Sequence, residues 1–274
     1  MRSPEEIKAT LENAKSGLQE SLVRSLGTYT VALFAITSSG DAERLHFSGT
    51  GTLVTVGNCD CILTAAHVWH DGLKSSSHVG KTLKEDVEHR CPIEAKALIP
   101  FGPPIPPKWN EWGPDLVFLR IPMNHIGGIK AFKSFYPLDK SRPKPELDGV
   151  EALLLMGAPG EFEKHTPTRS ELNINGFFSD VNAEPYVRGD FDFVDLREEV
   201  NLPGLPKDFG GVSGGGLWRV RVFESPKTAK IDWLSFLEGV AFYQLKLADP
   251  HIIIRCHGQD TIRTAMKEVP LNLK

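Results

Sequence analysis

The sequence has few cysteines, no long apolar run and no excess of positive charge. Four cysteines in 274 residues are too few and too scattered for a disulfide framework. No apolar run approaches the roughly 18 residues that a membrane-spanning helix needs, so we expect no membrane span. Lys and Arg number 31 against 35 Asp and Glu, a net charge of −4. Nucleic-acid-binding proteins normally carry a basic excess, so no nucleic-acid partner is expected.

The first residues also lack the features of a secretory signal. Residues 1–22 contain two early acidic side chains and no apolar core. We therefore expect a cytoplasmic protein whose cysteines are free thiols. Metal binding is not expected either, because C-x-C and H-x-C spacings do not match structural zinc sites. The residues considered for such a site are Cys59, Cys61, His89 and Cys91.

Two amphipathic helices are predicted, one at each end of the chain. In the first, residues 3–26, Ser3 and Glu6 form a capping box, and Gly27 ends the helix. Its apolar residues recur every three or four positions and form one stripe. We expect the stripe to pack on the body of the protein; the alternative is a docking site for a regulatory protein partner or a second copy. The second helix lies within residues 258–274 and has an apolar stripe of Ile262, Ala265, Met266 and Val269.

Between the helices, the chain is rich in glycine (25) and proline (20), and its apolar residues occur in short runs that indicate β-strands. Many short strands separated by such turns predict an all-β barrel or sandwich. The stretch 132–149 is the expected crossover between two β units. Strands are predicted near residues 29–37, 44–56, 60–64, 94–99, 115–121, 150–156, 169–178, 214–222, 236–245 and 251–256.

Three segments carry residue types that act together in nucleophilic catalysis. They are TAAH at 64–67, DLVFL at 115–119 and GVSGG at 211–215. A serine hydroxyl is a poor nucleophile near neutral pH and needs a base within hydrogen-bond reach. Histidine suits that role because its ordinary pKa is near neutrality, and a carboxylate on its other nitrogen fixes the tautomer. Glycines beside the serine let two backbone N–H groups face a developing oxyanion.

Together these segments resemble the motifs of the chymotrypsin/trypsin-like serine peptidases. Each segment matches one family motif, and the order His, Asp, Ser is also the family's order. The resemblance covers about residues 28–269. It implies an all-β fold of two six-stranded Greek-key β-barrels with an N-terminal and a C-terminal helix. The implied division is helix 1–27, first barrel 28–135, second barrel 136–257 and helix 258–274.

The resemblance also implies a role for each matching residue. His67 is the expected general base and later acid, Asp115 the group that orients it, and Ser213 the nucleophile. The backbone N–H groups of Gly211 and Ser213 form the expected oxyanion hole. The chain is thus interpreted as a serine endopeptidase that cleaves protein or peptide substrates through an acyl-enzyme. It needs no cofactor, because the triad supplies its own nucleophile and base.

The serine segment departs from the digestive members of the family at two positions. Val212 and Gly216 stand where those members have aspartate and proline. In those members the aspartate pairs with an N-terminal amine that cleavage frees, a pair that valine cannot make. The chain is therefore closer to intracellular and HtrA-type relatives, although no PDZ domain fits in its residues. We expect the Gly- and Pro-rich loop 200–212 to act as a switch that a partner or ligand orders.

The specificity pocket is predicted less sharply. By resemblance Lys207 lies at its base with Asp208 beside it, and the strand containing Phe242, Tyr243 and Gln244 lines it. A lysine at the base favours an acidic substrate side chain, whereas an inward Asp208 favours Lys or Arg. The third interpretation is that both charges are solvated in a loop.

The sequence leaves a second function class open. The same fold with an inactive site would serve as a protein-binding module. The complete triad argues against this alternative, whereas the altered pocket and oxyanion loop leave it open.

Overall fold

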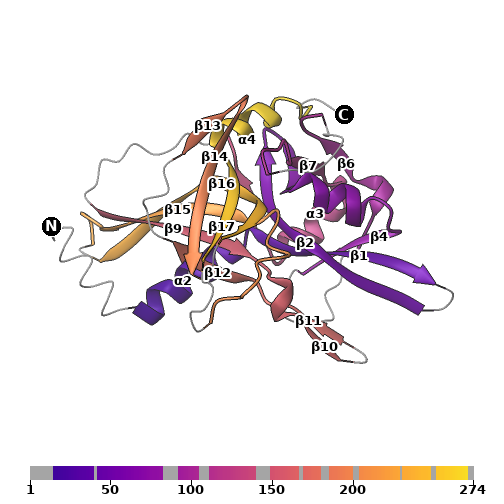
Figure 1. The fold of residues 1–274 in the computed structure, drawn as a ribbon, viewed down its shortest axis with the longest axis horizontal. Helices are drawn as coiled ribbons and strands as arrows, with labels where there is room; N and C mark the ends of the chain where they lie inside the picture. The colour runs from indigo at the N-terminus through magenta and orange to yellow at the C-terminus, as the bar shows by residue number, and fades with distance from the viewer. Residues whose placement is uncertain are drawn as a thin grey trace.

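The protein is described here from a computed structural model. It covers residues 15–39, 42–82, 92–104, 111–139, 149–166, 169–179, 185–199, 204–228, 230–247 and 251–270. Most of these residues lie in strands of two sheets, which Figure 1 shows in indigo to magenta and in rose to yellow. The architecture confirms the predicted all-β double-barrel fold with few helices.

The first sheet has eight strands among the described residues, in the order β5-β4-β1-β2-β3-β7-β6, with β8 paired in parallel to β2. Continuous apolar runs explain the central strands, because β1 buries residues 31–36 and every residue of β3 is buried. The strands are β1 (Thr30–Ser39), β2 (Ala42–Val56), β3 (Cys59–Thr64), β4 (His78–Lys81), β5 (Ile93–Glu94), β6 (Ile99–Phe101), β7 (Val117–Arg120) and β8 (Tyr136–Pro137).

The second sheet has seven strands in the described part, in the order β12-β9-β15-β16-β17-β14-β13, all antiparallel. A bulge in β16 leaves Phe242 without a partner, since Ala241 pairs with Cys256 and Tyr243 with Arg255. The strands are β9 (Gly149–Gly157), β12 (Asn175–Ser179), β13 (Tyr186–Arg188), β14 (Phe191–Glu199), β15 (Gly216–Glu224), β16 (Ile231–Lys246) and β17 (His251–Gly258). A separate hairpin joins β10 (Lys164–Thr166) and β11 (Arg169–Glu171).

The first and the last described helices pack against an apolar cluster that both sheets share. The first described helix, α2 (Lys15–Gly27), ends at Gly27 as predicted, and residues 3–14 lie outside the described residues. Leu22 and Leu26 of α2 are buried, so this part of the stripe packs on the body of the protein. The predicted C-terminal stripe packs in the same way. Other helical segments are η1 (Val68–Leu73), η2 (Ala95–Ala97), α3 (Met123–Lys130), η3 (Gly160–Phe162) and α4 (Gln259–Met266).

One apolar cluster joins both sheets to both helices. Trp218 is fully buried in it, stacked on Tyr29 at 5.4 Å and edge-on to Tyr136 at 5.0 Å. Leu26 comes from α2 and Ile262 from α4. Because aromatic rings bury much apolar area, this cluster fixes the two sheets against each other and so fixes the site between them.

Several details differ from the sequence prediction. The predicted strand 94–99 is two short strands separated by η2, and 169–178 is split between β11 and β12. Strands β4, β8, β10, β13 and β14 were not predicted. Cys59, Cys61 and Cys256 are buried free thiols, and Cys91 and His89 lie outside the described residues. The proposed domain boundaries stay a prediction. Within the described ranges, no helix is both long and apolar enough to cross a membrane.

Candidate active site

His67 follows directly on a buried strand of the first sheet. After β3 ends at Thr64, Ala65 and Ala66 are buried, and small side chains there let the chain turn into η1. The His67 side chain is 29% exposed. The imidazole is therefore anchored by a packed backbone and still open to a substrate.

Asp115 binds His67 at two points. The Asp115 Oδ2 lies 2.6 Å from His67 Nδ1, and Oδ1 accepts a hydrogen bond from the His67 backbone N–H at 2.9 Å. Asp115 is 2% exposed and precedes β7, which pairs with β3. A buried carboxylate on Nδ1 fixes the ring so that Nε2 is the acceptor, which is the arrangement a general base needs.

His257 of the second sheet is a residue of this site that the sequence analysis missed. Its Nε2 accepts a hydrogen bond from the Asp115 backbone N–H at 3.1 Å. Burial lowers the pKa of His257 to about 4. The ring is therefore neutral near pH 7 and can accept this bond. A lone histidine in an apolar strand gave no signal for the contact, because its partner lies 142 residues away in the sequence.

The loop that contains Ser213 is bound to β2 of the first sheet. The Thr50 N–H donates to the Ser213 carbonyl at 2.9 Å, and the Thr50 hydroxyl donates to the Gly211 carbonyl at 2.7 Å. Thr52 adds a hydroxyl bond to the Gly214 carbonyl at 3.1 Å. These bonds hold the serine loop against the sheet that carries His67.

A glycine allows this close approach. Gly214 has φ +90°, and a Cβ there would overlap the Thr50 carbonyl and the Thr64 hydroxyl. Thr64 is three residues before His67, so the backbone beside Ser213 lies against the segment that leads to His67. The structure thus brings the segments of His67, Asp115 and Ser213 to one place between the sheets.

The orientation of two peptide groups bears on the predicted oxyanion hole. In a trans peptide the C=O and N–H point in opposite directions. The Gly210 carbonyl accepts a bond from Gly160 N–H at 2.8 Å, and the Val212 carbonyl accepts one from Gly215 N–H at 2.7 Å. The next N–H groups, those of Gly211 and Ser213, therefore point away from these donors. In the described part of the chain neither donates a hydrogen bond.

The charged residues of the predicted pocket lie at the surface. Lys207 and Asp208 are exposed, and Asp208 forms an ion pair with Lys246 at 3.2 Å. Their backbone N–H groups both donate to Glu161 Oε2, at 2.7 and 2.9 Å.

The three pocket residues predicted on β16 differ in their surroundings. Gln244 accepts a hydrogen bond from Phe209 N–H at 2.9 Å, and Phe209 itself is buried. Phe242 is buried against His257, whereas Tyr243 is half-buried. Gln244 and Phe209 therefore help to fix the loop before Ser213.

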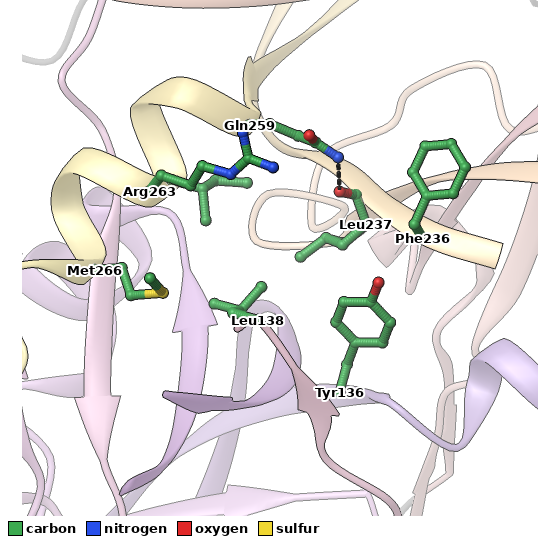
Figure 2. Close-up of a pocket in the computed structure, with 8 residues that line it drawn as sticks. Tyr136, Leu138, Phe236, Leu237, Gln259, Arg263 and Met266 are labelled. Carbon is green, nitrogen blue, oxygen red and sulfur yellow. Dashed lines mark hydrogen bonds between the residues drawn. The ribbon is translucent and has the colours of Figure 1, made fainter. Parts of the chain in front are cut away.

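A small pocket outside this site lies between β8, β16 and α4. Figure 2 shows Arg263 and Met266 of α4 beside Tyr136 and Leu138, with the Gln259 amide donating to the Leu237 carbonyl at 2.8 Å. None of the residues predicted for the active site lines it. Among the described residues, no group of three or more His, Cys, Asp or Glu side chains is arranged to hold a metal ion.

Comparison with known proteins supports the fold. No protein-family model and no curated protein sequence matches the chain. Among solved structures, an "HtrA-type protease AlgW with decapeptide" is similar, with a TM-score of 0.50 and 11% identity over 91% of this chain and 66% of that chain.

A second solved structure is described as "Aromatic interactions drive the coupled folding and binding of the intrinsically disordered Sesbania mosaic virus VPg protein". It has a TM-score of 0.44 and 14% identity over 90% of this chain and 100% of that chain. At such identities similarity concerns the fold alone, and the likeness to AlgW shows that this chain has a trypsin-like protease fold.

Proposed function

We propose that the protein is a serine endopeptidase of the intracellular, HtrA-like kind that cleaves protein or peptide substrates through an acyl-enzyme on Ser213. The contact between His67 Nδ1 and buried Asp115 Oδ2 at 2.6 Å carries the proposal. A structural histidine would not need a buried carboxylate on one ring nitrogen while its side chain stays partly open to solvent. The serine loop bound beside it supplies the expected nucleophile.

The proposed reaction follows from these groups. His67 Nε2 takes the Ser213 hydroxyl proton as the oxygen attacks the substrate carbonyl, and Asp115 stabilises the imidazolium. The N–H groups of Gly211 and Ser213 bind the oxyanion. His67 then protonates the leaving amine, and water hydrolyses the acyl-enzyme by the same groups in reverse. No cofactor takes part in these steps.

Among the described residues, contacts from within the fold hold the oxyanion loop. Val212 is 1% exposed, and Gly157 packs against it so closely that a Cβ would lie 2.7 Å from Val212 Cγ1. An apolar, enclosed side chain at this position supports activation by a route other than a freed amine. Contacts from Glu161, Gln244 and Gly160 hold the loop instead. We therefore propose that an N-terminal tag leaves activity unchanged, and that removal of residues 1–26 weakens it because Leu22 and Leu26 are core residues.

Labelling with a fluorophosphonate probe tests the proposal. The wild-type protein should be labelled at Ser213, and both Ser213→Ala and His67→Ala should abolish labelling and peptide hydrolysis with unchanged circular dichroism. Ser225→Ala, a change at a serine in the turn after β15, is the matched control and should be labelled like the wild type. Wild-type hydrolysis by Ser213→Ala would contradict the mechanism. A folded wild-type protein that neither reacts nor cleaves would instead support the protein-binding module.

We also propose that a partner or ligand regulates the activity of the enzyme. A partner that binds α2 would have to use its exposed face, because its apolar stripe packs in the core in the described residues. A latent enzyme would react weakly with the probe and faster when the partner or a peptide is added. Equal labelling rates with and without added peptide would contradict latency and leave the peptidase proposal standing.

A further inference from the structure

His257 contacts the backbone of Asp115, and the proposed reaction does not use it. It is fully buried in β17, and its Nε2 accepts the hydrogen bond from the Asp115 backbone N–H at 3.1 Å. Because Nε2 accepts, it bears no proton, and the neutral ring bears its proton on Nδ1. The contact is therefore a specific one that depends on one nitrogen of the ring.

The backbone just before Asp115 passes close to the His257 imidazole. Gly113 has φ +57°, and a Cβ there would lie 2.5 Å from His257 Cε1 and 2.8 Å from Nε2. Only glycine allows the backbone to pass so close to the ring edge. The position of the ring thus sets the path by which the chain reaches Asp115.

The face of the His257 ring contacts a segment of β16 that also binds the serine loop. Phe242, the bulged residue of β16, stacks on His257 with 4.0 Å between ring centres and an interplanar angle of 13°. Bulges near active sites commonly re-aim a side chain, as here. The preceding residue, Ala241, accepts a bond from Gly214 N–H at 2.7 Å and donates one to the Gly215 carbonyl at 2.9 Å. One short segment therefore supports both the imidazole and the loop of Ser213.

We propose that His257 is a positioning residue of the candidate triad: its Nε2 fixes the Asp115 backbone, and through it the carboxylate that holds His67, while its stacking on Phe242 connects that carboxylate to the serine loop. This inference rests on the proposed function. It adds a connection from the second sheet to the acid of the first.

The environment of the ring supports this role over simple core filling. Its Nδ1 is buried and has no hydrogen-bond partner among the described residues. A buried unpaired donor is destabilising, and an apolar side chain of similar size would avoid that cost. Burial keeps the pKa near 4, and the nearby carboxylates of Asp115 and Asp192 only partly oppose this. The neutral acceptor that the contact needs is thereby maintained at neutral pH.

Three substitutions of His257 and one control test the inference. His257→Gln places an amide oxygen near the position of Nε2, His257→Asn is too short to reach it, and His257→Leu has no acceptor. The control, His251→Leu, makes the same change at the other end of β17. For each protein we would measure the fluorophosphonate labelling rate, the melting temperature and the NMR chemical shift of the His67 Nδ1 proton, which reports the hydrogen bond to Asp115.

A displaced Asp115 should slow labelling in His257→Leu and His257→Asn by about 10- to 100-fold, since an ångström of misplacement can cost that much. The His67 Nδ1 proton should move upfield, because its hydrogen bond to Asp115 weakens. His257→Gln should recover the labelling rate to within about fivefold of the wild type and restore the chemical shift, and His251→Leu should leave both unchanged. Equal labelling rates and equal His67 Nδ1 proton shifts in wild type and His257→Leu would overturn the inference. So would equal defects in His257→Gln and His257→Asn, which also decide the matter if His257→Leu does not fold.

Failure of the proposed function would look different. If wild-type Ser213 does not react with the probe, the peptidase proposal fails. The chemical shift of the His67 Nδ1 proton still reads the contact between Asp115 and His67 in that unreactive chain. An upfield change of this shift in His257→Asn, reversed in His257→Gln, would support the positioning role even then.

Discussion

The two sheets each hold the other's part of the candidate active site, by different chemistry. The serine loop of the second sheet is held by Thr50 and Thr52 of β2, through hydroxyl and backbone bonds. The acid of the first sheet is held by His257 of β17, through one imidazole nitrogen. Threonine hydroxyls do not titrate over the pH range in which proteins fold, whereas an imidazole does. One support is therefore independent of pH, and the other is not.

The largest expected effect comes from the acid itself. Asp115→Asn should lower the rate of peptide hydrolysis about 10⁴-fold, the loss known for the same change in the chymotrypsin-type triad, because an amide neither fixes the tautomer nor stabilises the imidazolium. Steady-state kinetics on a peptide substrate would measure it. Asp60→Asn is the control, since Asp60 is also a buried aspartate but pairs with Lys130. A loss of less than tenfold in Asp115→Asn would mean that His67 works without this partner.

The next effect tests the pH dependence of the imidazole support. Desolvation lowers the pKa of His257 to about 4 in the folded protein, against about 6.5 when unfolded. Between these values the unfolded chain binds more protons, so the free energy of unfolding rises with pH across this window and falls as pH falls. The change is on the order of 3 kcal/mol, since each pKa unit corresponds to about 1.4 kcal/mol. Below pH 4 and above pH 6.5 it should be constant.

Urea unfolding at a series of pH values checks this, with His257→Gln as the matched variant. The difference in unfolding free energy between the two proteins should change between pH 6.5 and 4 and stay flat at higher pH. Contributions from carboxylates elsewhere are common to both proteins and cancel. A difference that does not vary over this window would show that His257 is not buried as a neutral ring.

The sequence predicted the parts of the site that are local and missed those that are made by the fold. His67, Asp115 and Ser213 each lie in a short motif, so their segments could be recognised from neighbouring residues. His257 has no such motif, because its partners Asp115 and Phe242 belong to other strands. Whether these residues act as predicted is what the substitutions test.

Strand β14 was not predicted for the same reason, because its stabilising contacts come from other elements of the fold. β14 contains Asp192 and Asp195 among its apolar residues, and aspartate disfavours strands. The fold compensates for both charges. Asp192 accepts bonds from Thr261 N–H at 2.6 Å and Asp260 N–H at 3.1 Å at the start of α4, and Asp195 binds Arg255 through both oxygens at 2.8 Å. Such tertiary contacts cannot be deduced from the local pattern.

A smaller effect is expected when the threonine support is weakened. The Thr50 hydroxyl donates to the Gly211 carbonyl at 2.7 Å and accepts from Ala158 N–H at 3.0 Å. Thr50→Val keeps the shape but removes the partner of the half-buried Gly211 carbonyl and of the buried Ala158 N–H, so it should lower the unfolding free energy by about 1–3 kcal/mol. Labelling should slow about tenfold, because a displaced Gly211 shifts an oxyanion donor. Urea unfolding and labelling rates at pH 7 measure the two effects.

Thr52→Val provides the graded comparison. It removes a single bond of 3.1 Å to the Gly214 carbonyl, so both of its effects should be smaller than those of Thr50→Val. Neither variant should alter the pH dependence of stability between pH 4 and 6.5, because no titrating group is touched. A larger defect in Thr52→Val, or a changed pH profile, would contradict the division of the two supports.

The smallest effect is expected at the exposed charges of the loop before Ser213. Asp208 and Lys246 pair at 3.2 Å with side chains 52% and 71% exposed, and such surface pairs contribute about 0–1 kcal/mol. Asp208→Asn keeps the oxygen that accepts from Gly210 N–H at 2.7 Å, and Lys207→Ala removes only a solvated ammonium. Both should therefore change stability by less than about 0.5 kcal/mol and leave the preferred substrate side chain unchanged.

Cleavage of a peptide library by each variant measures that preference, with Gln244→Ala as the contrasting change because it frees the Phe209 N–H. A preference for acidic or basic side chains that disappears in Lys207→Ala or Asp208→Asn would show that the charge faces the substrate, and the loop would then select substrates as well as hold the serine.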